Sequence, residues 1–112
     1  MTFKVMETNK FLADLEEALY WLYSNNLEQS QDFADRKFHE LEQEINTLKV
    51  HLKETPRMGQ IDEVSGLRRF PVYGGRYIAS WIIDETANTV TLLEFRDAKY
   101  PQRLREFQFD ED

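Results

Sequence analysis

Arginine and tyrosine side chains recur in the C-terminal part of the chain, and they are the residues there best suited to chemistry. An arginine guanidinium is a planar fork of donors that fits a phosphate or a carboxylate, and a tyrosine ring stacks on a base or packs in a protein interface. The alternative is structural, with tyrosines half-buried in a sheet and arginines covering its edges. The set comprises Arg68, Arg69, Tyr73, Arg76, Tyr77, Arg96, Lys99 and Tyr100.

The charge of the chain changes sign along its length. The formal net charge is −7, which taken alone disfavours a nucleic acid partner because phosphate repels an acidic surface. Residues 1–66 hold 13 acidic and 7 basic residues, residues 67–105 hold 4 acidic and 7 basic ones, and Glu106 to Asp112 adds four acidic ones. The basic patch, which is mainly arginine, is either a functional face or an ordinary solvated surface.

Several kinds of chemistry have no candidate residues. There is no cysteine, which excludes disulfides and thiolate metal sites. His39 and His51 lack a ligand neighbour at metal-binding spacing, so we expect both at the surface. Gly74-Gly75 lacks the other glycines of a phosphate loop, and no serine lies in a hydrolase elbow. We expect no metal and no cofactor.

The chain has no feature that indicates a membrane. Its first residues lack a secretory signal, and the longest nearly apolar run, Tyr77 to Ile83, is far shorter than the roughly 20 residues that cross a bilayer. A cytoplasmic location and the absence of a membrane partner are therefore expected.

The elements that must position these residues begin with a short strand and two helices. Phe3 to Met6 alternates as a strand does, and apolar residues then recur at helical spacing from about Asn9 to Ser24. Asn25-Asn26 is expected to supply a left-handed cap, with Asn26 and Gln29 as the capping box of the next helix. That helix, with Ala34, Phe38, Leu41, Ile45, Leu48 and Leu52 on one stripe, is predicted to end near Glu54, before Pro56.

Extended structure is predicted from Leu67 onward. The strands are Leu67 to Tyr73, Tyr77 to Asp84 and Thr89 to Phe95, joined by turns at Gly74-Gly75 and Asn88, in an antiparallel meander. The middle strand is apolar on both faces and belongs at the centre of the sheet, whereas Pro71 places its strand at an edge or bulge. Gln60 to Gly66 is expected to be a polar connector. The helical hairpin should cover the sheet, with Ile45 and Trp81 in one core.

The order of elements and several short motifs resemble the RelE/ParE toxin family. The motifs are Pro56-Arg57-Met58-Gly59, Gly66 to Val72, Arg76-Tyr77-Ile78 and Leu92 to Asp97, and the resemblance spans about Phe3 to Arg103. It implies an α+β fold of β-α-α-β-β-β order, with an antiparallel helical hairpin packed on an antiparallel β-meander. Residues 1–105 would form one toxin domain, and residues 106–112 an acidic tail.

The resemblance also implies a function within a type II toxin–antitoxin, or plasmid stabilisation, system. Members are neutralised by a cognate antitoxin and act on DNA gyrase or, with the ribosome, as messenger-RNA endonucleases. By position, the site residues of a nuclease would be Arg68, Arg69, Arg76, Arg96 and Tyr100.

Cleavage through the RNA 2′-hydroxyl also needs a base, and no histidine follows His51. Asp97 or Glu94 could act as that base only if burial raised its pKa. We therefore favour a ParE-like toxin that is not an enzyme and inhibits growth by binding a target such as DNA gyrase. The alternatives are a RelE-like endonuclease and a non-toxic family member that serves as a protein-binding module.

Overall fold

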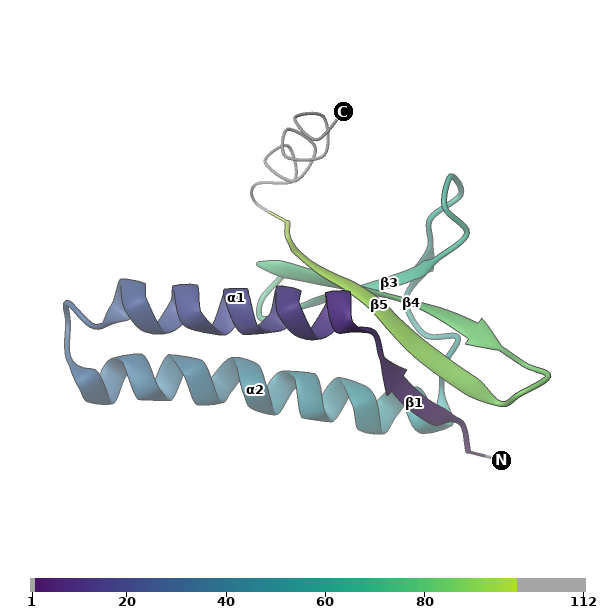
Figure 1. The fold of residues 1–112 in the computed structure, drawn as a ribbon, viewed down its shortest axis with the longest axis horizontal. Helices are drawn as coiled ribbons and strands as arrows, with labels where there is room; N and C mark the ends of the chain where they lie inside the picture. Colours follow the sequence, from purple (N-terminus) through teal and green to yellow (C-terminus); the bar gives the residue numbers. More distant parts are fainter. Residues whose placement is uncertain (1, 99–112) are drawn as a thin grey trace.

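A helical hairpin packs against one face of a five-stranded sheet in the computed structural model, which describes residues 2–98 (Figure 1). The elements are β1 (Lys4–Glu7), α1 (Asn9–Asn26), α2 (Gln31–Glu54), β2 (Gln60–Ile61), β3 (Arg68–Val72), β4 (Tyr77–Asp84) and β5 (Thr89–Asp97). The predicted α+β class is confirmed. One short strand, β2, was not predicted. It lies in the segment from Gln60 to Gly66, which was expected to be a polar connector.

The sheet has the strand order β1-β5-β4-β3-β2. β3, β4 and β5 form the expected antiparallel meander, with the apolar β4 in the middle, whereas β1 pairs with β5 in parallel. The positive φ angles of Gly74 and Gly75, 65° and 84°, make the turn between β3 and β4. Asn88, with a φ of 54°, serves the turn before β5. The sheet is thus mixed rather than wholly antiparallel.

The helix ends differ from the prediction at the loop between α1 and α2. The N-cap of α2 is Ser30, whose hydroxyl accepts a hydrogen bond from the amide of Phe33, so the predicted capping box at Asn26 and Gln29 is wrong. α1 continues to Asn26, and the side-chain amides of Asn25 and Asn26 donate to the carbonyls of Trp21 and Leu22, one turn earlier. No left-handed cap forms there, since Leu27 is right-handed.

The core lies between the hairpin and the sheet. Ile45 on α2 is 1% exposed and Trp81 on β4 is 0% exposed, and both belong to the same buried cluster, as predicted. The indole nitrogen Nε1 of Trp81 donates to the carbonyl of Pro56 at 2.9 Å, so the largest core side chain has no unsatisfied polar group. This bond connects the sheet to the loop that follows α2.

The outer edge of β3 is only partly covered by β2. β2 pairs with Arg68 and Arg69, and no other strand of residues 2–98 pairs with residues 70–72 on that side. The carbonyl of Leu67 points outward to the amide of Asp62. Outward groups alternate along a strand, so the backbone groups of Pro71 and the amide of Tyr73 also point outward, whereas the carbonyl of Tyr73 accepts from the amide of Arg76 in the turn. Proline has no amide hydrogen, and the amide of Tyr73 donates to Glu44 Oε1 at 2.8 Å. This edge therefore offers no free donor to a further strand.

Within residues 2–98, no helix is both long and apolar enough to span a membrane. His39 and His51 lie on the exposed surface of α2, as expected.

Candidate functional site

Arg69 on β3 and Arg96 on β5 lie on the face of the sheet that the helices leave open. The register pairs Arg69 with Ser80 and Arg96 with Ile78, and these partners alternate with the core residues Ala79 and Trp81. Directly opposed residues share a face, so both arginines point away from the core. β3 and β5 flank β4, which puts the two Cα atoms about 12 Å apart by standard strand spacing.

The acidic neighbours of these two arginines include Asp62 and Glu94. Hydrogen bonds from the amides of Val64 and Ser65 lower the pKa of Asp62, and the charge of Arg69 lowers it further. Glu94 pairs with Ser80 and therefore lies in the row of Arg69, and Glu94 Oε2 is 3.8 Å from Lys10 Nζ. Within residues 2–98, neither Arg69 nor Arg96 makes an ion pair. Arg69 interacts with Asp62 without forming a close ion pair, so both guanidinium groups keep hydrogen-bond donors for an external anion.

Arg68 lies on the opposite face from Arg69. It pairs with the core residue Trp81, and its Nη1 donates to the carbonyl of Arg57 at 2.6 Å. The guanidinium therefore caps the loop after α2 rather than joining the open face.

Arg76 is held by side chains on the helix side of the sheet. Its Nη2 lies 3.3 Å from Asp97 Oδ2, and its guanidinium stacks over the Trp21 ring of α1 at 4.5 Å and over Tyr77 at 5.5 Å. Its charge and its planar surface are both engaged within the fold. Asp97, one of the two carboxylates considered as a base, is the partner of this arginine.

The predicted arginine set is thus divided by the fold. Arg69 and Arg96 share the open face, whereas Arg68 and Arg76 are bonded on the other side. Lys99 and Tyr100 lie outside the described residues. Among residues 2–98, no cluster of His, Cys, Asp and Glu side chains could hold a metal ion.

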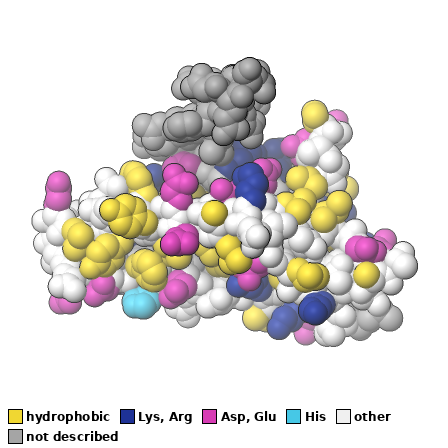
Figure 2. Space-filling view, in the orientation of Figure 1, with side chains coloured by type: hydrophobic (Ala, Val, Ile, Leu, Met, Phe, Trp, Pro, Cys, Tyr) yellow, Lys and Arg dark blue, Asp and Glu magenta, His cyan; other side chains and the backbone are white. Residues whose placement is uncertain are grey.

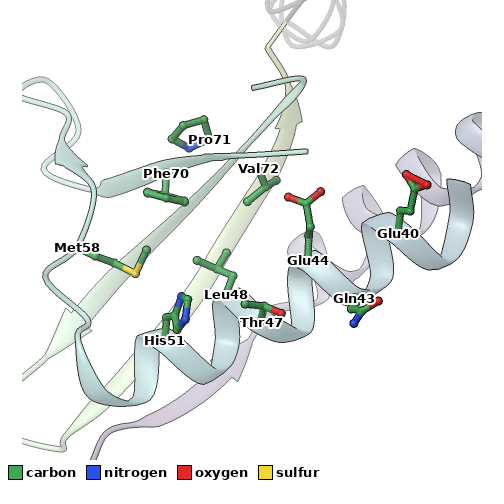
Figure 3. A pocket seen from close by; sticks show the side chains of 10 residues that line it. All are labelled: Glu40, Gln43, Glu44, Thr47, Leu48, His51, Met58, Phe70, Pro71 and Val72. Atoms are coloured by element: carbon green, nitrogen blue, oxygen red, sulfur yellow. The ribbon is translucent and has the colours of Figure 1, made fainter. Parts of the chain in front are cut away.

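An acidic groove, which the sequence did not indicate, runs between α2 and the outer edge of β3 (Figure 3). Its volume is about 500 Å³. Phe70 and Val72 point from β3 toward α2, and Pro71 points away. The lining residues are Glu40, Gln43, Glu44, Thr47, Leu48, His51, Met58, Phe70, Pro71 and Val72.

The carboxylates of the acidic groove affect the tyrosine at its end. Burial raises the pKa of Tyr73 above its usual 10.0, and the charges of Glu40 and Glu44 and a hydrogen bond to Glu40 raise this pKa further. Burial likewise raises the pKa of Tyr77, which stacks on Phe95 with ring centroids 5.0 Å apart. Both side chains therefore stay protonated to a higher pH than an ordinary tyrosine.

A second, more apolar groove follows the seam of the helical hairpin. Its volume is about 680 Å³. Figure 2 shows hydrophobic side chains gathered over the hairpin, on the half that projects past the sheet. The residues that line this hairpin groove are Leu12, Leu15, Glu16, Leu19, Tyr20, Tyr23, Asp35, Phe38 and His39. Exposed aromatic and aliphatic side chains in one groove are typical of protein-binding surfaces.

Solved structures share this arrangement of hairpin and sheet. A chain of the chromosomal ParDE toxin–antitoxin system from P. aeruginosa aligns with a TM-score of 0.59 and 17% identity, over 85% of this chain and 95% of that one. The fold is that of the RelE/ParE-type toxins. A chain of the RelBE2 toxin–antitoxin complex from Mycobacterium tuberculosis aligns with a TM-score of 0.50 and 20% identity, over 87% of this chain and 99% of that one.

By sequence alone, no protein-family model and no curated protein matches the chain. The RelE/ParE-type toxin fold is therefore evident from the backbone arrangement, and at these identities the structural likeness extends to the fold alone.

Proposed function

We propose that this chain is the toxin of a type II toxin–antitoxin pair and that it acts as a ParE-like toxin, by binding an intracellular protein target such as DNA gyrase. The cognate antitoxin would be a protein that covers the exposed grooves. The toxin–antitoxin complexes that share the RelE/ParE-type fold support this role. We further propose that residues 1–105 form the toxin domain, that residues 106–112 are an acidic tail and that the protein acts in the cytoplasm.

The observation that carries the ParE-like choice is the division of the arginines between the two faces. A nuclease must place several cations around one phosphate and must also supply a base and an acid. Here Arg68 and Arg76 are bonded away from the open face, and no histidine of residues 2–98 lies on the sheet. The two grooves, in contrast, offer surfaces that suit protein partners.

A RelE-like endonuclease is the second candidate, and one observation favours it. Arg69 and Arg96 lie on the open face without an ion pair among residues 2–98, so they could hold a phosphodiester between them. Tyr100 would then belong to the same site. In the third candidate, a non-toxic binding module, the same grooves bind a partner without consequence for growth.

Three measurements separate these functions. Induction of the chain in a bacterial host should arrest growth, which the non-toxic module would not do. Purified protein should inhibit DNA supercoiling by gyrase, and primer extension in a translating extract should reveal no new messenger ends. New ends that vanish in Arg96→Ala would overturn the ParE-like function and establish the nuclease.

A further inference from the structure

We propose that the acidic groove binds an amphipathic helix that carries basic side chains, and that it excludes an added β-strand. The natural occupant would be a segment of the antitoxin, which is the one respect in which this proposal rests on the proposed function.

The length and direction of the acidic groove suit a helix. Along α2 its lining residues recur every three or four positions from Glu40 to His51, which is one helical face of about 17 Å, or three turns. The half-buried Met58 and Phe70 supply apolar surface along this length, above the buried Leu48 and Val72. A partner helix that lies beside α2 could insert side chains at i, i+3 or i+4 and i+7 between α2 and β3.

The charge of the acidic groove determines which charged side chains the partner helix should carry beside its apolar face. Of the residues between 2 and 98 that line it, two are carboxylates, Glu40 and Glu44, and none is Lys or Arg. Glu40 pairs with Lys37 at 3.5 Å and also accepts a hydrogen bond from the Tyr73 side chain, and Glu44 uses one oxygen for the amide of Tyr73. A carboxylate has about four acceptor sites, so each keeps further acceptor capacity. Lysine or arginine on the partner would complement these groups, whereas acidic flanks would be repelled.

The closed edge of β3 rules out the other common way of binding at a sheet. Strand addition needs outward amide donors, but Pro71 has none and that of Tyr73 is bonded to Glu44. An added strand could use the amide of Tyr73 only by breaking its hydrogen bond to Glu44, so the exchange would give no net gain in hydrogen bonds. Side-chain recognition by a helix leaves this bond intact.

The test uses two synthetic peptides of roughly 18 residues, long enough to form helix in isolation. Both carry the same leucine face, and one has lysine and the other glutamate on the flanks. Titration into the full chain would be followed by NMR amide shifts. We expect the lysine peptide to shift the amides of Phe70 and Val72 and to bind about five to ten times more tightly than the glutamate peptide at low salt.

Two charge variants complete the experiment. Glu40→Gln/Glu44→Gln should abolish the preference for lysine, while Glu28→Gln/Glu42→Gln, which removes the same charge from exposed positions outside the groove, should keep it. The proposal is overturned if the peptides bind equally well or not at all, if both variants lose the preference alike, or if the shifts map to Leu19 and Tyr23 of the hairpin groove. Absence of growth arrest would defeat the proposed toxin function and leave the peptide result standing.

Discussion

Glu44 on α2 accepts a hydrogen bond from the backbone amide of Tyr73, 29 residues later in the chain, with a distance of 2.8 Å. Tyr73 has a φ of 55°, a left-handed conformation that is uncommon for an aromatic residue. The helix thus holds both the edge of β3 and the strained first residue of the turn that follows. Turn, edge and hairpin are coupled through one side chain.

Removal of this side chain should loosen the β3 edge. In Glu44→Ala the amide of Tyr73 loses its acceptor, at a cost of about 1 kcal/mol, and its hydrogen exchange should accelerate about fivefold. The neighbouring exposed Glu42 contacts only His39 among the interactions described, so Glu42→Ala is the matched control and should leave Tyr73 unchanged. Equal exchange rates in both variants would show that Glu44 does not protect the edge.

The core prediction concerns Ile45. Ile45→Val should lower the free energy of unfolding by about 0.5 to 1.5 kcal/mol, and Ile45→Asp should unfold much of the protein because it buries an unpaired charge in a fold of marginal stability. Val50 lies on the same helix but is 59% exposed, so Val50→Asp is the control and should have little effect. Urea denaturation followed by circular dichroism measures all three. A small loss in Ile45→Asp would contradict the placement of this residue.

Tyr73 and Tyr77 should make stability fall at alkaline pH. Their pKa values are raised in the folded state, so the folded protein retains these protons while the unfolded chain loses them above pH 10.0. The stability that these two protonated tyrosines contribute is complete below pH 10.0, and it is lost as the pH rises through their pKa values in the folded protein. Ultraviolet titration should show delayed tyrosinate formation, and Tyr73→Phe should reduce the loss of stability between pH 9 and 11. An unchanged loss in that variant would contradict the assignment to Tyr73.

Arg76 should contribute to stability through its shape as well as its charge. Arg76→Ala removes the pair with Asp97 and the contact with Trp21, and we expect a loss of about 1 to 2 kcal/mol. Arg76→Lys keeps the charge but not the planar stacking, so it should restore only part of this stability and should change the fluorescence of Trp21. Full restoration by lysine would mean that the stacking contributes nothing.

Local patterns were sufficient to predict most of the fold. The apolar stripe of α2 and Pro56 placed the end of that helix correctly at Glu54, and the apolar sequence of β4 placed this strand in the middle of the sheet. The loop between the helices was mispredicted because Asn26 and Ser30 are both residue types that cap helices. In the structure the Ser30 hydroxyl accepts from the amide of Phe33, whereas the Asn26 side chain donates back to the carbonyl of Leu22 in α1. β2 has only two residues, too few to produce a pattern.

The site was less predictable than the fold. Adjacent residues in a strand face opposite ways, so the separation of Arg68 from Arg69 was implicit in the sequence once the strand was placed. The contacts of Arg76 could not be predicted in this way, because Trp21 and Asp97 lie in distant elements that only the tertiary fold brings together. The acidic groove likewise combines α2 with β3, and neither segment reveals it alone.

The parallel pairing of β1 with β5 sets a condition on synthesis. Lys4 pairs with Thr89 and Glu7 with Leu92, so the first strand has no partner in the sheet until nearly the whole described chain has been translated. At roughly 5 to 20 residues per second, this interval is on the order of 5 to 20 s. Val90, Leu92 and Phe95 of β5 also complete the core, so a nascent chain that lacks them cannot close it. A chain that ends upstream of β5 lacks both the sheet partner of β1 and part of the core, so the domain can complete its fold only after β5 has left the ribosome.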